Sequence, residues 1–352
     1  MRVVTLRGLR RSAASTRFPW RDVGYYGLLA LPFALIAVSL TLGLYGISIE
    51  HVLRALLSPV FPQLAEGVSS TELTLVLRIR LPRILSAVLI GATLASTGVA
   101  FQGIFKNPLV DSNLLGVTSG AGFGAALALL LGGTALLVQG FAFGFGLLAV
   151  SLAYAGSRLY STAPMIVLTL MGILIGSFFG SLTSLMKYIA DPLNTLPAIT
   201  FWLLGGLTGV TWNSIPMLAL FAVAGSIFLW LVRWRLNILS LGDAEATTLG
   251  MNPNRLKLVI IVCATLMTAA AVAVGGVIGW IGLVIPHAGR MLVGPDHKRL
   301  VPVSLALGAS FLLLIDNISR TLLPAEVPLG ILTGLVGVPL LVVLLRRSRT
   351  GW

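Results

Sequence analysis

The chain has 352 residues, of which 57% are hydrophobic and 10% are charged. A soluble globular chain carries roughly 25% charged residues. The composition therefore excludes a soluble globular protein and indicates that lipid replaces water over much of the surface. The net charge of +13 would suit a nucleic-acid binder. The basic residues, however, fall in short joints between long apolar stretches. This placement favours a role in membrane topology and in contact with anionic headgroups, and argues against nucleic acid as a partner.

Ten apolar stretches approach the length of about 20 residues that a helix needs to cross a bilayer. We therefore predict an all-α polytopic membrane protein with about ten transmembrane helices. Nine helices is the alternative, because the seventh and eighth stretches are separated only by Gly275 and Gly276. In chain order, the stretches are 25–45, 84–102, 114–131, 135–155, 165–186, 215–231, 258–274, 277–291, 303–318 and 328–345.

The charges predict the orientation of these helices. With ten spans both ends of the chain lie on one side, and that side holds 18 of the 24 Lys and Arg residues. The positive-inside rule makes this side cytoplasmic. We expect a basic cytoplasmic segment over 1–23, one membrane domain over 24–346 and a cytoplasmic tail over 347–352. The first span is expected to stay in place, because no small-residue cleavage site follows a short apolar segment.

Three joints are long enough to carry structure of their own. The outer segment 46–83 contains Pro59, Pro62 and Pro82, which should interrupt a long helix. A second outer segment, 187–213, includes an apolar run that predicts a short helix over 198–207 at the outer face. The longest inner joint, 233–257, predicts a short helix over 244–249, with Asp243 at its start and Gly250 at its end.

Signs of catalysis are missing from the sequence. It holds neither a GxxxxGK(S/T) phosphate loop nor an HExxH zinc helix, and its three histidines and single Cys263 are too scattered for a metal site. Paired carboxylates deep in the spans, which a proton-coupled carrier would need, are also missing. Asp316 and Arg320 are spaced i, i+4, which favours a local ion pair. If the chain is a pump, another protein must supply the energy.

Several ordered motifs resemble the FecCD family of permeases, the membrane subunits of ABC importers for ferric siderophores, haem and cobalamin. The resemblance covers about residues 25–346. The motifs are Arg80-Leu81-Pro82-Arg83; Gln102 followed by Lys106-Asn107-Pro108-Leu109; Phe201-Trp202-Leu203-Leu204-Gly205; Gly242-Asp243 with Leu249-Gly250; Gly279-Trp280-Ile281-Gly282 through Pro286-His287 to Arg290; Asp316 with Arg320; and Glu326-Val327-Pro328-Leu329-Gly330.

The resemblance implies the fold of a type II ABC importer permease and a homodimer with the passage along its twofold axis. Two ATPase subunits, which hold ATP and Mg²⁺, would bind on the cytoplasmic side, and a periplasmic or lipid-anchored binding protein would dock outside. The chain itself would have no catalytic site, cofactor or metal. It would lie in the inner membrane of a bacterial or archaeal cell, with both termini cytoplasmic. Importers of siderophores, haem, cobalamin and oxyanions share these motifs, so the motifs do not select the cargo. The alternative function is an ATP-independent secondary carrier or channel.

The resemblance also assigns roles to residues. Coupling to the ATPase falls on Gly242, Asp243, Glu245, Thr248, Leu249 and Gly250; docking of the binding protein on Arg80, Arg83 and Arg320; and the cytoplasmic gate on Asn107, Pro108, Leu109, Ser161 and Thr162. Each set also has a plainer interpretation. The first could be an ordinary capped connector, the second could pair internally with Asp316, and the third could be a simple corner between two helices.

Overall fold

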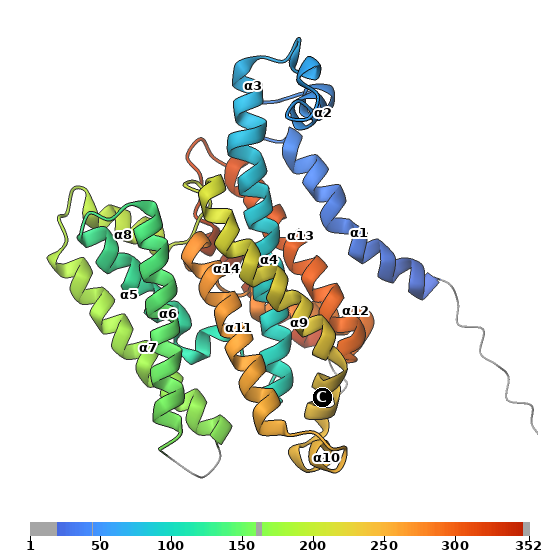
Figure 1. Cartoon of the computed structure of the whole chain (residues 1–352), viewed down its shortest axis with the longest axis vertical. Helices are drawn as coiled ribbons and strands as arrows, with labels where there is room; N and C mark the ends of the chain where they lie inside the picture. The colour runs from blue at the N-terminus through green and yellow to red at the C-terminus, as the bar shows by residue number, and fades with distance from the viewer. Residues whose placement is uncertain (1–19, 44, 160–163, 348–352) are drawn as a thin grey trace, which may run out of the picture.

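The structure is a computed structural model that describes residues 20–43, 45–159 and 164–347. These residues form one helical bundle without strands (Figure 1). Its helices are α1 (Trp20–Thr41), α2 (Ile49–Leu57), η1 (Pro62–Ala65), α3 (Ser70–Thr74), η2 (Leu75–Arg80), α4 (Leu81–Phe105), η3 (Ser112–Leu115), α5 (Val117–Leu130), α6 (Ala135–Ser157), α7 (Pro164–Ile189), α8 (Thr195–Leu203), η4 (Trp212–Ser214), α9 (Ile215–Leu241), α10 (Asp243–Thr248), α11 (Pro253–Gly275), α12 (Ile281–Val293), α13 (His297–Thr321) and α14 (Leu329–Arg347).

The predicted spans match the observed helices. Eight helices of the described chain are long and apolar enough to cross a membrane. The apolar helices α5 and α12 are shorter and correspond to the third and eighth predicted stretches. The prediction of about ten is therefore confirmed over the alternative of nine, since α11 ends at Gly275 and α12 begins only at Ile281.

Helices α4, α11 and α13 form the centre of the bundle, because most of their apolar surface is buried by other helices. Gly91 of α4 and Gly308 of α13 lie backbone to backbone, and a Cβ on Gly91 would collide with the carbonyl oxygen of Gly308. Small residues permit this close approach where lipid offers no hydrophobic drive for association. By contrast, α1, α7 and α14 leave most of their apolar side chains exposed, which suits contact with lipid or with a second subunit.

One prediction about the outer segment is wrong. Residues 70–105 form one continuous helical rod, so Pro82 does not interrupt it. The reason lies one turn earlier, where η2 is a π-helical turn and the Leu81 amide donates to the carbonyl of Val76. This wider turn gives the proline ring room that a regular α-helical turn would deny it. The rod thereby carries α3 outward, where it packs with α2 beyond the other helices (Figure 1).

Both short helices predicted in the joints are present. The outer one, α8, covers Thr195–Leu203 and so begins three residues before the predicted segment and ends four residues earlier. The inner one, α10, covers Asp243–Thr248. It lies at the opposite end of the bundle from α2 and α3, near the point where the described chain ends (Figure 1). The two ends of the bundle therefore carry different structures: the docking candidates lie at the outer end, and the coupling candidates lie at the inner end.

Candidate functional site

A cluster of four charges lies at the outer end, where α4, α13 and the loop before α14 meet; Arg83, Asp316 and Arg320 are buried, and Glu326 is partly exposed at its edge. The Arg83 guanidinium donates from Nε to Asp316 Oδ1 at 2.9 Å and from Nη1 to Glu326 Oε1 at 2.8 Å. Arg320 Nε lies 3.1 Å from Asp316 Oδ2. Asp316 is fully buried, so its charge is balanced by the two arginines rather than by water.

Two arginines, Arg80 and Arg320, donate hydrogen bonds to backbone carbonyls at and just after the outer end of α1. Arg80 Nη1 donates to the carbonyl of Leu40 at 2.6 Å, and its Nη2 donates to that of Tyr45. Arg320 Nη1 donates to the carbonyl of Leu42 at 3.2 Å. The last carbonyls of a helix have no partner within it, so these arginines supply the missing donors.

This geometry bears directly on the predicted docking residues. Arg80, Arg83 and Arg320 are only 5%, 5% and 8% exposed, and each guanidinium is bonded inside the subunit. The internal pair between Arg320 and Asp316 is confirmed. Docking through these arginines stays a prediction, and it requires them to exchange internal partners for external ones.

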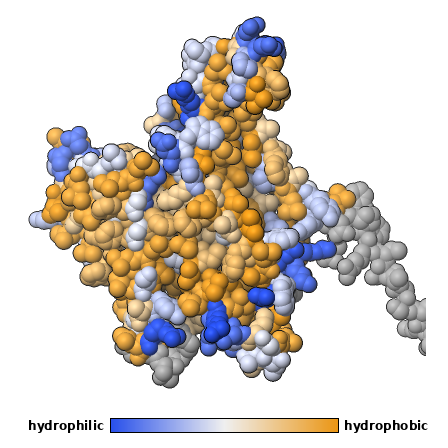
Figure 2. Space-filling model, viewed as in Figure 1, coloured by the Kyte–Doolittle hydropathy of each residue, from blue (hydrophilic) through white to orange (hydrophobic). Residues whose placement is uncertain are grey.

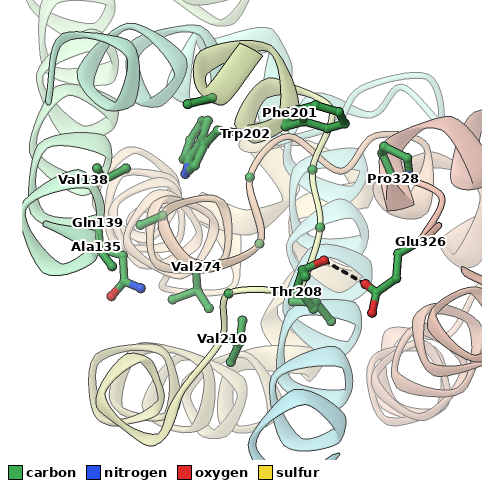
Figure 3. Close-up of a pocket in the computed structure, with 18 of the residues that line it drawn as sticks. Ala135, Val138, Gln139, Phe201, Trp202, Thr208, Val210, Val274, Glu326 and Pro328 are labelled. Carbon is green, nitrogen blue, oxygen red and sulfur yellow. Dashed lines mark hydrogen bonds between the residues drawn. The ribbon is translucent and has the colours of Figure 1, made fainter. Parts of the chain in front are cut away.

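Next to the cluster, a cavity of about 460 Å³ opens between α6, α8 and α11 (Figure 3). Its wall is mostly apolar, with Phe201, Trp202 and Val274 among the lining residues. The polar groups are few: Thr208 donates to Glu326 Oε2 at 2.7 Å, as the dashed line in Figure 3 shows, and Gln139 donates to Ser214. The cavity is therefore a weakly polar chamber, and Glu326, the one carboxylate among its described lining residues, is bonded to Thr208 and to Arg83, which also lines it.

Glu326 titrates at an acidic pH. Burial raises the pKa of its carboxyl, but the hydrogen bonds from Arg83 and Thr208 outweigh this and hold the pKa below the usual range. Glu326 is consequently an anion at neutral pH and joins three elements: α4 through Arg83, the segment after α8 through Thr208 and the loop before α14.

A junction of glycine backbones forms part of the cavity wall. Gly205 and Gly276 have φ values of +72° and +67°, in the left-handed region that favours glycine. A Cβ on Gly276 would collide with the carbonyl oxygen of Trp202. The amide of Gly206 donates to Gly275, and that of Leu329 donates to Gly205, at 2.9 Å each. The ends of α8 and α11 and the start of α14 are thus joined without side chains.

At the inner end, α10 is held by one buried contact and one ion pair. Ala246 is fully buried, and Lys257 Nζ donates to both oxygens of Asp243 at 2.6 and 2.7 Å. Lys257 itself is buried in α11, so α10 is fixed to the base of a central helix. Gly250, at φ +77°, ends the connector.

The rest of α10 faces outward. Leu241 and Leu249 are 69% and 61% exposed at its two ends, and Asp243, Glu245 and Thr248 are exposed between them. The Glu245 carboxylate lies against Gly242, where a Cβ would meet it. Except for the buried Gly242, the predicted coupling residues therefore form, with Leu241, one small exposed surface that is apolar at its ends and acidic at its centre.

The predicted gate residues lie at a tight corner after α4. Lys106 ends the helix in the left-handed conformation, and Asn107 Oδ1 accepts the amide of Leu109 at 2.9 Å. Leu109 is exposed, whereas Asp111, four residues after Asn107, is buried and caps η3. Burial raises the pKa of the Asp111 carboxyl. Ser161 and Thr162 lie outside the described residues.

The comparisons with known proteins decide the family. The model of the FecCD transport family matches residues 30–347. The chain belongs to this family. It is 39% identical to the molybdate import system permease protein MolB of Haemophilus influenzae over 329 residues, which are 93% of this chain and 96% of the relative. It is 38% identical to the hemin transport system permease protein HmuU of Yersinia pestis over 282 residues, 78% of this chain and 83% of the relative.

The solved structures agree. The FecCD chain superposes on a metal-chelate type ABC transporter in an inward-facing conformation with a TM-score of 0.83 and 36% identity, covering 93% of this chain and 99% of the other. It therefore has the fold of a type II ABC importer permease, as the resemblance implied.

Sequence reasoning missed two residues that the FecCD permease uses to build these sites. Glu326 was noticed only as part of a motif, and Lys257 only as a basic residue of a joint. Both carry a signal that could have found them, because a charged residue in so apolar a chain must have a partner or reach water. Their partners, Arg83 and Asp243, are bonded at 2.8 and 2.6 Å.

Proposed function

We propose that this FecCD permease carries a metal chelate or a comparable metal-containing cofactor or oxyanion into the cytoplasm, driven by a separate ATPase. The relatives support this cargo class, because their names give molybdate, haemin, iron chelates and cobalamin as cargoes. The weakly polar outer chamber supports a passage that makes few specific contacts, so that selection falls to a binding protein.

The surface of α10 is the observation that carries the proposal. An exposed helix with apolar ends and acidic centre lies outside the spans, and the Lys257–Asp243 pair ties it to α11. Movement of α10 would therefore pull directly on a central helix. We propose that the ATPase receives Gly242, Asp243, Glu245, Thr248, Leu249 and Gly250 in a cleft, and that its closure on ATP binding switches the permease between outward and inward access.

Two copies of the chain are proposed to form the passage. Helix α7 presents Ile166, Leu170, Leu174 and Phe178 at a spacing of four residues, and all four are exposed. A stripe of this kind on one subunit suits packing against a twofold-related copy. The corner Asn107–Leu109, together with Ser161 and Thr162, would then close the passage at its cytoplasmic end.

The binding protein is proposed to dock on the opposite end, over α2, α3 and the arginine cluster. The exposed charges Glu50, Arg54, Glu66 and Arg78 would make the first contacts and set the orientation. Acidic side chains of the binding protein could then engage Arg83 or Arg320 in exchange for Asp316 and Glu326. This orientation places both termini and α10 in the cytoplasm, as the excess of Lys and Arg on that side predicts.

Co-purification with the proposed partner ATPase tests the proposal. With an affinity tag on this chain, we expect the ATPase to elute with the permease, and replacement of Gly242, Asp243 and Glu245 by alanine to remove it. The matched control replaces three exposed residues at the other end, Glu50, Gln63 and Glu66, by alanine and should retain the ATPase. Equal retention by both triple variants would contradict coupling through α10.

A further inference from the structure

A groove runs along the face between α9 and α11, separate from the sites described above. Its upper part is a hollow of about 620 Å³ lined only by apolar or small side chains, among them Phe221, Ala224, Val262 and Met267. Its lower part is a second hollow of about 400 Å³. Phe228 and Val259 line both hollows. The two hollows therefore adjoin, and together they form a groove that follows α9 and α11 from the middle of the spans to the end of the bundle that carries α10.

The chemistry of the groove changes along its length. The lower hollow is lined by Trp234, Arg235, Asn252 and Arg255. Both arginines are exposed, and within residues 20–43, 45–159 and 164–347 neither forms an ion pair with a carboxylate. The Arg235 guanidinium lies 5.5 Å from the centre of the Trp234 ring. Two positive charges thus lie at the foot of an apolar groove, beside a tryptophan of the kind found at membrane interfaces.

The groove opens on a surface that faces lipid. Leu220, Leu258 and Val259 on its rim are exposed although α9 and α11 are membrane-spanning helices. Figure 2 shows an apolar surface over α9 and α11, with hydrophilic residues gathered at its α10 end. An occupant must therefore be apolar over most of its length and anionic at the end that meets the arginines. Guanidinium groups bind phosphate through paired hydrogen bonds, and the cytoplasmic leaflet is rich in anionic phospholipids.

We propose that the groove between α9 and α11 binds an anionic phospholipid of the cytoplasmic leaflet. The phosphate lies between Arg235 and Arg255, and an acyl chain follows Phe228 and Val262 up to Met267. The inference rests on the proposed orientation of the permease, in which α10 is cytoplasmic. Gly250, Met251 and Asn252, which join α10 to α11, also line the lower hollow. The bound headgroup therefore contacts the connector between α10 and α11, which is proposed to carry the movement of the ATPase to the spans. This contact restrains the position of α10.

Native mass spectrometry of the full chain, taken from nanodiscs of phosphatidylcholine and phosphatidylglycerol, tests the site. We expect wild-type protein to retain phosphatidylglycerol in preference to phosphatidylcholine. The double variant R235Q/R255Q should bind phosphatidylglycerol about a hundredfold more weakly, since each of the two charged contacts that it removes contributes on the scale of a tenfold change in affinity. The variant V262W, which fills the groove, should lose the lipid as well.

Two matched controls separate the site from general effects. R158Q removes an exposed arginine that lies over Tyr154 at the end of α6, away from the groove. V223W adds the same bulk on α9 at an exposed position that does not line the groove. Both should retain phosphatidylglycerol as wild type does. The elution profile and thermal midpoint of each variant show that it is folded.

Several results would overturn the inference. One is equal retention by R235Q/R255Q and R158Q; another is equal retention of both lipids by the wild type. Loss of the lipid when the ATPase binds would reassign Arg235 and Arg255 to the ATPase contact, and loss on dimerisation would assign the groove to a second copy. Lipid retention is measured independently of transport. A chain that transports nothing but retains the lipid would therefore refute the proposed function while still supporting the lipid site.

Discussion

Replacement of Asp316 by asparagine should destabilise the permease more than any exposed charge replacement. Asp316 is fully buried between Arg83 at 2.9 Å and Arg320 at 3.1 Å, and both guanidinium groups are themselves nearly excluded from solvent. The variant D316N leaves two buried positive charges facing a neutral amide. Removal of one partner from a buried pair typically costs about 3–5 kcal/mol.

The surroundings set where in that range the cost falls. Arg83 keeps Glu326, and Arg320 keeps the carbonyls of Ser39 and Leu42. We therefore expect the lower end, about 3 kcal/mol, which for a chain of this length corresponds to a fall in the thermal midpoint of roughly 4 °C. Thermal unfolding of the detergent-solubilised protein, followed by intrinsic fluorescence, measures it.

The matched control is E50Q. Glu50 forms an i, i+4 pair with Arg54 at 2.6 Å, but both side chains are exposed. Such pairs contribute about 0.2–1 kcal/mol, so the midpoint should hardly move. The double variant D316N/R320Q should be less destabilised than the two single variants added together, because it removes one uncompensated charge. A D316N midpoint as high as that of E50Q, or strict additivity in the double variant, would refute the account of the cluster.

Three further predictions concern the junction, the connector and pH. G276A should lower the free energy of unfolding by about 1–3 kcal/mol more than G132A does. Both glycines have positive φ, but only at Gly276 would the added Cβ meet a neighbouring carbonyl oxygen. Equal thermal midpoints of the two variants would contradict the account of the junction. D243N, which strips the partner from buried Lys257, should lower ATP-driven uptake about 5-fold or more, whereas the exposed E66Q should not. The folded-state pKa of Glu326 lies below its unfolded value of about 4.3, so its contribution to stability is complete above that pH and is lost as the pH falls through the folded pKa. E326Q should therefore be less stable at pH 7 and show a smaller loss in acid than wild type; parallel curves would contradict this.

The spans and the inner connector could be predicted from the sequence because local signals define them. Lipid requires long apolar stretches with few charges, so the helices appear directly in the composition. Asp243 and Gly250 mark the two ends of α10, and the structure places that helix within one residue of the prediction. The helical rod from Ser70 through α4 could not be predicted, because the π-helical turn that accommodates Pro82 leaves no mark in the sequence, and α9 continues to Leu241, ten residues beyond its predicted span.

The outer cluster could not be predicted in the same way. Asp316 and Glu326 are 233 and 243 residues from Arg83 along the chain, so nothing local indicates that they meet. The resemblance assigns Arg80, Arg83 and Arg320 to docking, with internal pairing as the plainer interpretation, and the structure buries all three. The i, i+4 spacing of Asp316 and Arg320 was the one part of the cluster with a local signal, and that pair is present.

ATP-dependent uptake into liposomes tests the central claim most directly. The permease, the proposed partner ATPase and the proposed binding protein are reconstituted together and offered haem, a ferric siderophore, cobalamin and molybdate in parallel. We predict that one of these accumulates only with ATP, and that alanine at Gly242, Asp243 and Glu245 abolishes the accumulation. Uptake that persists without ATP or without the ATPase would contradict the claim and make the chain a secondary carrier or channel.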